Sequence, residues 1–159
     1  MPSRPRDCLA ATSVAQALVQ LAEERGRSLT PLQIIKLVYI AHGFWLALKG
    51  EPLVRDSAEA WPYGPVFPRL YRVLSPWGRQ GVPADALAAF QSEELTDEHQ
   101  GLITTVLEKY GHLNGLALSH LTHREGTPWS QVQKGDSLDR AIPNPIIKEH
   151  YAALLEPTL

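Results

Sequence analysis

Histidine side chains gather in one short stretch of the sequence, at His112, His120 and His123. His120 and His123 are three residues apart, so a helix would place both on one face. Because neutral imidazoles are zinc ligands, a metal site is one hypothesis for this stretch. A structural zinc site needs further ligands, and the chain has a single cysteine and no nearby carboxylate at a familiar spacing. The alternative is that His123 is a core histidine whose partners are backbone groups and hydroxyls such as that of Thr122.

The same stretch contains the residue types of a nucleophilic triad, Ser119, His123 and Glu125. The sequence around Ser119 lacks the glycine-rich elbow that makes a serine reactive. Cys8 is a poorer nucleophile, with only Arg4 and Arg6 nearby to stabilise a thiolate. We therefore assign no catalytic residue. The enzyme alternative that stays open is a tryptophan-lined pocket into which four polar side chains converge: His42, Tyr63, Ser119 and His123.

Nucleotide and nucleic-acid binding have little support. No G-x-x-x-x-G-K loop is present, so no cofactor is indicated. The first two expected helices have the length of a helix-turn-helix, but the second is apolar on nearly every face and offers no polar surface to read bases. A transcriptional regulator, the third class of function, would need salt-dependent DNA binding, for which a net charge of −2 gives little reason.

Length and composition indicate one globular domain. The chain has 159 residues, of which 44% are hydrophobic and 20% charged, enough to bury one core. The single cysteine cannot close an intrachain disulfide, which favours the cytoplasm. The longest apolar stretch, residues 34–48, is interrupted by Lys36 and His42 and is too short to cross a bilayer. We expect a buried helix there and no membrane contact.

Capping signals and periodicity predict a mainly α-helical fold, a single compact multi-helix domain around a central buried helix. Thr30, Pro31 and Gln33 form a capping box that begins this central helix, over about residues 31–49. Thr12 or Ser13 could cap a first helix, Thr96 and Asn114 later ones. At most a small β-hairpin is expected near residues 53–61, and residues 1–11 are expected to be flexible.

Charge and aromatic residues are unevenly distributed. Residues 1–80 carry 10 Lys and Arg against 6 Asp and Glu, a net +4, whereas residues 81–159 carry 5 against 11, a net −6. One interpretation is that these charges lie on solvated helix faces. The alternative is that Arg55, Arg69, Arg72 and Arg79 form a basic patch that binds an acidic partner. Most of the aromatic rings belong in the core of a small domain, but one or two could anchor an interface.

Several short motifs, in one order, carry a family resemblance. They are Lys36-Leu37-Val38-Tyr39-Ile40-Ala41-His42-Gly43, then Ala60-Trp61 with Tyr63-Gly64-Pro65-Val66, and later Leu118-Ser119, Thr122-His123 and Pro128-Trp129. In this order the chain resembles the Panacea domain, the SocA-like antitoxin family of bacterial and phage toxin–antitoxin modules. The resemblance covers about residues 12–151, and we place the domain at residues 12–156.

The resemblance implies a mainly helical, non-enzymatic binding module that neutralises a cognate toxin, encoded nearby, by direct protein–protein contact. Presentation of the toxin to a cellular protease is a second route, and a homodimer stays open. The shared region fills nearly the whole chain, so we expect no separate DNA-binding domain. The resemblance also implies a shared scaffold built from Tyr39, His42, Gly43, Trp61, Tyr63, Gly64, Pro65, Ser119, Thr122, His123, Pro128 and Trp129.

A family that meets unrelated toxins should vary the residues that contact them. We therefore place partner contact at less characteristic positions, Arg69, Arg72, Trp77 and Arg79.

Overall fold

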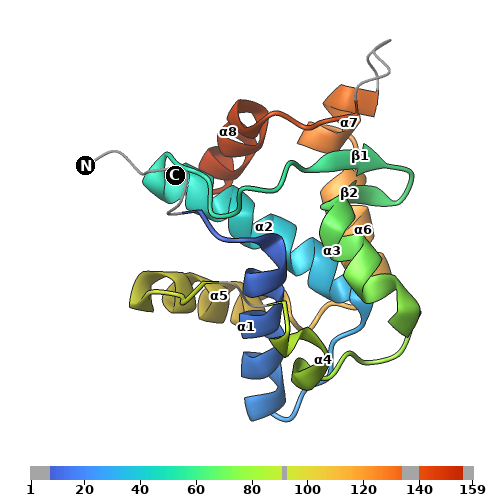
Figure 1. The fold of residues 1–159 in the computed structure, drawn as a ribbon. Helices are drawn as coiled ribbons and strands as arrows, with labels where there is room; N and C mark the ends of the chain where they lie inside the picture. The colour runs from blue at the N-terminus through green and yellow to red at the C-terminus, as the bar shows by residue number, and fades with distance from the viewer. Residues whose placement is uncertain (1–7, 91–92, 134–139, 156–159) are drawn as a thin grey trace.

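The computed structural model describes residues 8–90, 93–133 and 140–155. Over these ranges the chain is mainly α-helical, with one two-stranded antiparallel sheet (Figure 1). The elements are α1 (Ala11–Glu24), α2 (Pro31–Lys49), β1 (Glu59–Trp61), β2 (Gly64–Val66), α3 (Pro68–Leu74), a 3-10 turn (Ser75–Trp77), α4 (Ala84–Ala88), α5 (Asp97–Tyr110), α6 (Gly115–His123), α7 (Pro128–Gln133) and α8 (Asn144–Leu155).

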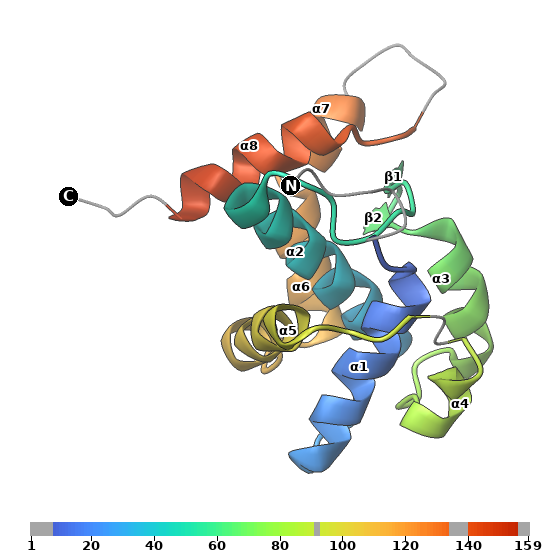
Figure 2. The same cartoon turned by 60° about the vertical axis from the view of Figure 1, so that its left-hand side comes forward.

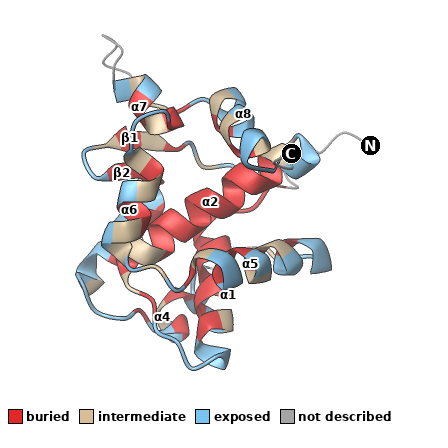
Figure 3. Cartoon of the chain, turned by 180° about the vertical axis from the view of Figure 1, so that it is seen from behind, coloured by how far each residue is buried: buried red, intermediate tan, exposed pale blue. Residues whose placement is uncertain are grey.

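The centre of the fold is α2, as the sequence predicted. The Thr30 side chain accepts a hydrogen bond from Gln33 N, and the Gln33 side chain accepts one from Thr30 N. Gly50 ends the helix at φ 75°. Neighbours on several sides, α1, α3, α5, α6, α8 and β2, bury the helix along most of its length (Figure 3). By length and composition α2 could cross a membrane, yet 78% of its apolar window is buried inside the domain. A core helix passes the same test.

The helix α8 lies along α2 (Figures 1 and 2). Gly43 on α2 makes this contact close, because a Cβ at that position would overlap the ring of Tyr151 on α8. That ring also packs edge-on against Phe44, with 4.8 Å between centroids. Gly43 is therefore required by packing between two helices and not by a turn.

The small hairpin expected near residues 53–61 is present, with its first strand at Glu59–Trp61 and its second continuing to Val66. β1 and β2 pair with Glu59 opposite Val66 and Trp61 opposite Gly64. The extended residues 53–55 do not pair with this hairpin. They pair instead with Leu9, whose N–H donates to Leu53 O and whose carbonyl accepts from Arg55.

That pairing also involves the end of the segment, residues 1–11, that we expected to be flexible. Residues 1–7 lie outside the described residues, but Cys8 and Leu9 are buried. α1 begins at Ala11, earlier than a cap at Thr12 or Ser13 allows. Two carboxylates distant in sequence serve its first turn: Asp56 accepts from Ala11 N at 2.9 Å and Glu93 from Ala10 N at 3.1 Å.

Candidate functional site

Four side chains from three helices hold the backbone of the hairpin. Each donates to a different carbonyl oxygen: Gln133 Nε2 to Ala60 (2.9 Å), Trp129 Nε1 to Trp61 (2.6 Å), Ser119 Oγ to Tyr63 and Lys36 Nζ to Pro65 (2.8 Å). The hairpin is thus fixed to α2, α6 and α7 through groups that do not depend on its own side chains. All four acceptors, and every donor except Gln133, belong to motifs that carried the family resemblance.

Lys36 is the least expected of these donors, since its side chain is completely buried in an apolar helix. Burial lowers its pKa to about 7. The amine also explains Gly64, which has φ 117°: a Cβ there would lie 3.0 Å from Lys36 Nζ. Gly64 therefore serves both the backbone conformation and the approach of the amine.

Ser119, Thr122 and His123 are held together by hydrogen bonds and ring packing on and beside α6. The Ser119 hydroxyl donates to Tyr63 O, and His123 Nδ1 lies 3.3 Å from that hydroxyl. Thr122 donates back to Leu118 O within α6, and the His123 ring packs edge-on against Trp129. A serine whose hydroxyl donates to a backbone carbonyl is held for structure, which gives the triad hypothesis no support.

The zinc hypothesis likewise gains no support. The rings of His120 and His123 are 6.3 Å apart, and among the described residues no group of three or more His, Cys, Asp or Glu side chains could hold a metal ion.

His42 connects three parts of the fold. Its Nδ1 accepts from Val54 N at 3.3 Å, so Nε2 carries the proton and donates to Asn144 Oδ1 at 2.9 Å. Burial lowers its pKa, which the hydrogen bond to Asn144 and the charge of Asp56 partly oppose. The neutral ring thereby ties α2 to the 53–55 segment and to the start of α8.

Tyr39, another signature position, is also buried in the core, where its ring packs against Phe67 and Tyr151. Its hydroxyl has no hydrogen-bond partner among the described residues. Pro128 begins α7, which supplies Trp129 to the hairpin.

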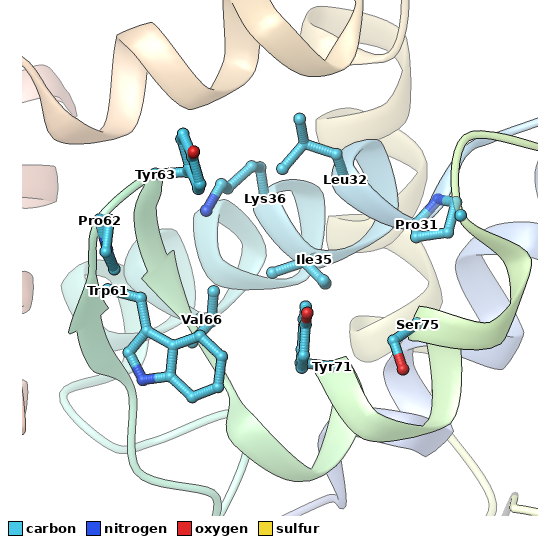
Figure 4. Close-up of a pocket in the computed structure, with 11 residues that line it drawn as sticks. Pro31, Leu32, Ile35, Lys36, Trp61, Pro62, Tyr63, Val66, Tyr71 and Ser75 are labelled. Carbon is cyan, nitrogen blue, oxygen red and sulfur yellow. The ribbon is translucent and has the colours of Figure 1, made fainter.

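A groove of about 360 Å³ opens beside the hairpin (Figure 4). Its walls come from the start of α2, from the hairpin and from α3, and they are mostly apolar: Pro31, Leu32, Ile35, Lys36, Trp61, Pro62, Tyr63, Val66, Tyr71, Ser75 and Gly78. Tyr63 and Tyr71 at its edge are 78% and 41% exposed. Neither His42 nor His123 lines the groove, so the polar residues of the enzyme hypothesis do not converge on it.

Of the predicted contact residues, Arg69, Arg72 and Arg79 are exposed on or just after α3, and Trp77 is half-buried against the core. Arg55 does not extend this basic patch as we expected. Its guanidinium forms an ion pair with Glu93 and donates to Cys8 O at 3.0 Å, so its charge is paired with a residue outside the predicted patch.

The sequence of the chain is similar to a known family of proteins and to one characterised antitoxin. The family described as Antitoxin SocA-like, Panacea domain, matches residues 34–130. The chain belongs to this family. It is also 31% identical over 154 residues to Antitoxin SocA of Caulobacter vibrioides, an alignment that covers 89% of this chain and 81% of that protein. No solved structure matches.

The matched residues 34–130 contain every signature position and the groove-lining part of α2, the hairpin and α3, apart from Pro31 and Leu32. Sequence reasoning did not identify Lys36, Tyr71 or Gln133 as part of a site. The one available signal was Lys36 itself, a lysine in a helix apolar nearly all round, which the sequence analysis treats as an interruption of the apolar stretch and as part of a family motif. Nothing in the sequence pointed to Gln133, because its contact is with a carbonyl far along the chain.

Proposed function

We propose that this protein is an antitoxin that neutralises a cognate toxin, encoded nearby, by binding it directly. The observation that carries the proposal is membership in the SocA-like Panacea family, together with the similarity to Antitoxin SocA over most of both chains. A cytoplasmic protein is in keeping with the single cysteine, which cannot form an intrachain disulfide.

The surface that best suits such binding is the hairpin with the groove beside it. Interface anchors are commonly Tyr, Trp and Arg, and this face presents Tyr63 and Tyr71 with Arg69 and Arg72 close by in sequence. The side-chain clamps on the hairpin backbone keep Tyr63 in place before a partner arrives, so little conformational entropy is lost on binding. We therefore extend the contact residues predicted from sequence, Arg69, Arg72, Trp77 and Arg79, by the two tyrosines.

The enzyme alternative has weaker support. It required His42, Tyr63, Ser119 and His123 to share a pocket. Of these four residues only Tyr63 lines the groove, and the buried His42 is bonded to Val54 and Asn144, apart from Ser119 and His123. For DNA binding, the described residues add no support beyond the little that the sequence analysis found.

Co-expression tests the proposed function. The adjacent open reading frame is expressed in a heterologous bacterial host, alone and together with this protein, and growth is measured before a tagged copy of this chain is purified. We expect arrested growth with the neighbour alone, rescue on co-expression, and elution of both proteins as one complex. A toxic neighbour that this protein neither relieves nor binds would contradict the proposal.

The same cultures separate blocking from degradation. If the antitoxin blocks the toxin, the toxin accumulates as a stable complex after protein synthesis is stopped. If it presents the toxin to a cellular protease, the toxin half-life falls on co-expression and recovers in a protease-deficient host.

A further inference from the structure

The groove beside the hairpin has rigid walls. The hairpin wall is clamped through the carbonyls of Trp61, Tyr63 and Pro65, and the opposite wall is the capped first turn of α2. The third wall is α3 with the 3-10 turn that follows it, from which Tyr71 and Ser75 line the groove. A volume of about 360 Å³ with apolar walls is at the small end of ligand sites, which suits one or two side chains of a partner.

The surroundings of the groove are basic. Residues 59–83, which form the hairpin, α3 and the following loop, contain three arginines and one acid, Glu59. Arg72 directly follows the groove-lining Tyr71, Arg79 directly follows Gly78, and both arginines are exposed. The nearest carboxylate in sequence on the hairpin side, Glu59, accepts a hydrogen bond from Trp61 Nε1 at 2.9 Å.

We infer that this groove receives an apolar side chain from an acidic segment of the toxin. The apolar walls take up the side chain, and the exposed arginines attract the carboxylates on either side of it. The inference rests on the proposed antitoxin function, because it names the chemistry of the partner segment.

Peptide binding to the full chain tests this chemistry. Three probes are titrated by calorimetry: Ac-Glu-Asp-Phe-Leu-Glu-Asp-NH2, the same peptide with lysine in place of each acid, and the same peptide with serine in place of Phe and Leu. We expect the first to bind with a Kd below about 1 mM and the other two at least about tenfold more weakly. Equal binding of the three, or no binding of the first at that concentration, overturns the inference.

Two matched pairs of variants locate the binding. Ser75→Phe fills the groove and should weaken the first peptide at least about tenfold, whereas Ser57→Phe, at an exposed position outside the groove, should not. Arg72→Glu with Arg79→Glu should weaken it similarly, whereas Lys109→Glu with Lys148→Glu, the same change in charge on α5 and α8, should not. Thermal melts confirm that each variant is folded. Unchanged binding by folded Ser75→Phe contradicts the inference.

Co-expression with the toxin separates the two proposals. If Ser75→Phe and the arginine pair still rescue growth as well as the wild type, the groove is not where the toxin binds, while the antitoxin function stands. If the wild type itself fails to rescue growth, the proposed function fails, and the toxin as occupant of the groove fails with it.

Discussion

At the scale of single residues, the signature positions serve the backbone more than they serve a partner. Ser119 and Trp129 donate to hairpin carbonyls, His42 joins α2 to α8, and Gly64 makes room for Lys36. Tyr63 differs, because its carbonyl is held while its side chain is 78% exposed. A family scaffold that fixes a backbone in this way can present different side chains to different partners.

Lys36 leads to a prediction about stability and pH. Its pKa is lowered from 10.5 to about 7 by burial, so between these values the unfolded chain carries a proton on Lys36 that the folded chain lacks. Stability must then rise with pH in this window, by up to about 1.4 kcal/mol per pH unit, and the contribution must level off below pH 7, where both states are protonated. Lys36→Met removes this dependence.

Urea unfolding of wild type and Lys36→Met at three pH values between 7 and 10 measures the difference. The wild type should gain on the variant as the pH rises, whatever the other groups do, since they are shared. Parallel curves for the two proteins would show that Lys36 keeps its ordinary pKa.

Tyr63 leads to a prediction about binding. Tyr63→Ala should change the free energy of unfolding by no more than about 0.5 kcal/mol, because the side chain is exposed. It should weaken toxin binding by about 2 kcal/mol, as expected of an interface anchor. The control is Leu154→Ala, an exposed apolar residue on α8, which should change neither. Calorimetric titration of each variant with the purified toxin measures binding, and chemical denaturation measures the free energy of unfolding. Equal weakening of toxin binding by the two variants would refute the role of Tyr63.

At the scale of elements, the sequence predicted what local chemistry determines. The capping box at Thr30 and the caps at Thr96 and Asn114 are confirmed, because the donor and acceptor of a cap are within three residues of each other. The start of α1 was wrong, and the pairing of residues 53–55 with Leu9 was not predicted. Both depend on contacts between distant parts of the chain, Asp56 with Ala11 and Leu9 with Leu53, which no local pattern encodes.

The site shows the same division. The aromatic and proline motif over residues 61–68 indicated a rigid segment, but the groove needs α2 and α3 beside it, and its existence follows only from their packing. The arginines of α3 were recognised as exposed basic residues. Arg55 was grouped with them because charge in a sequence does not reveal an ion pair with a residue as distant as Glu93.

The contact between α2 and α8 gives a prediction for Gly43. Gly43→Ala places a Cβ against the Tyr151 ring, so α8 must shift, at a cost of about 1–3 kcal/mol. Gly101→Ala on α5 is the matched control, since a Cβ there meets nothing within 4 Å, and it should leave stability unchanged or raise it by up to about 1 kcal/mol. Chemical denaturation compares the two, and equal stabilities would mean that α8 is not held closely at this point.

In the molecule as a whole, the central helix α2 supports an exposed face made by the hairpin and α3. The buried helix α2 supplies Lys36 to the hairpin and His42 to α8, and it forms one wall of the groove. The basic residues of the first half of the chain are partly neutralised within the fold, as Arg55 is, which leaves the α3 arginines as exposed charge beside the groove. We therefore propose that the toxin binds to the face made by the hairpin and α3.

One measurement tests this claim most directly: growth rescue of cells that express the adjacent toxin, by the wild type and by two double variants. Tyr63→Ala with Arg72→Glu changes the proposed face, and Leu154→Ala with Lys148→Glu makes the same kinds of change on α8. The account predicts that the wild type and the α8 variant restore growth and co-purify with the toxin, whereas the first variant, although folded, does neither. Full rescue by the first variant, or loss of rescue by the α8 variant alone, would contradict it.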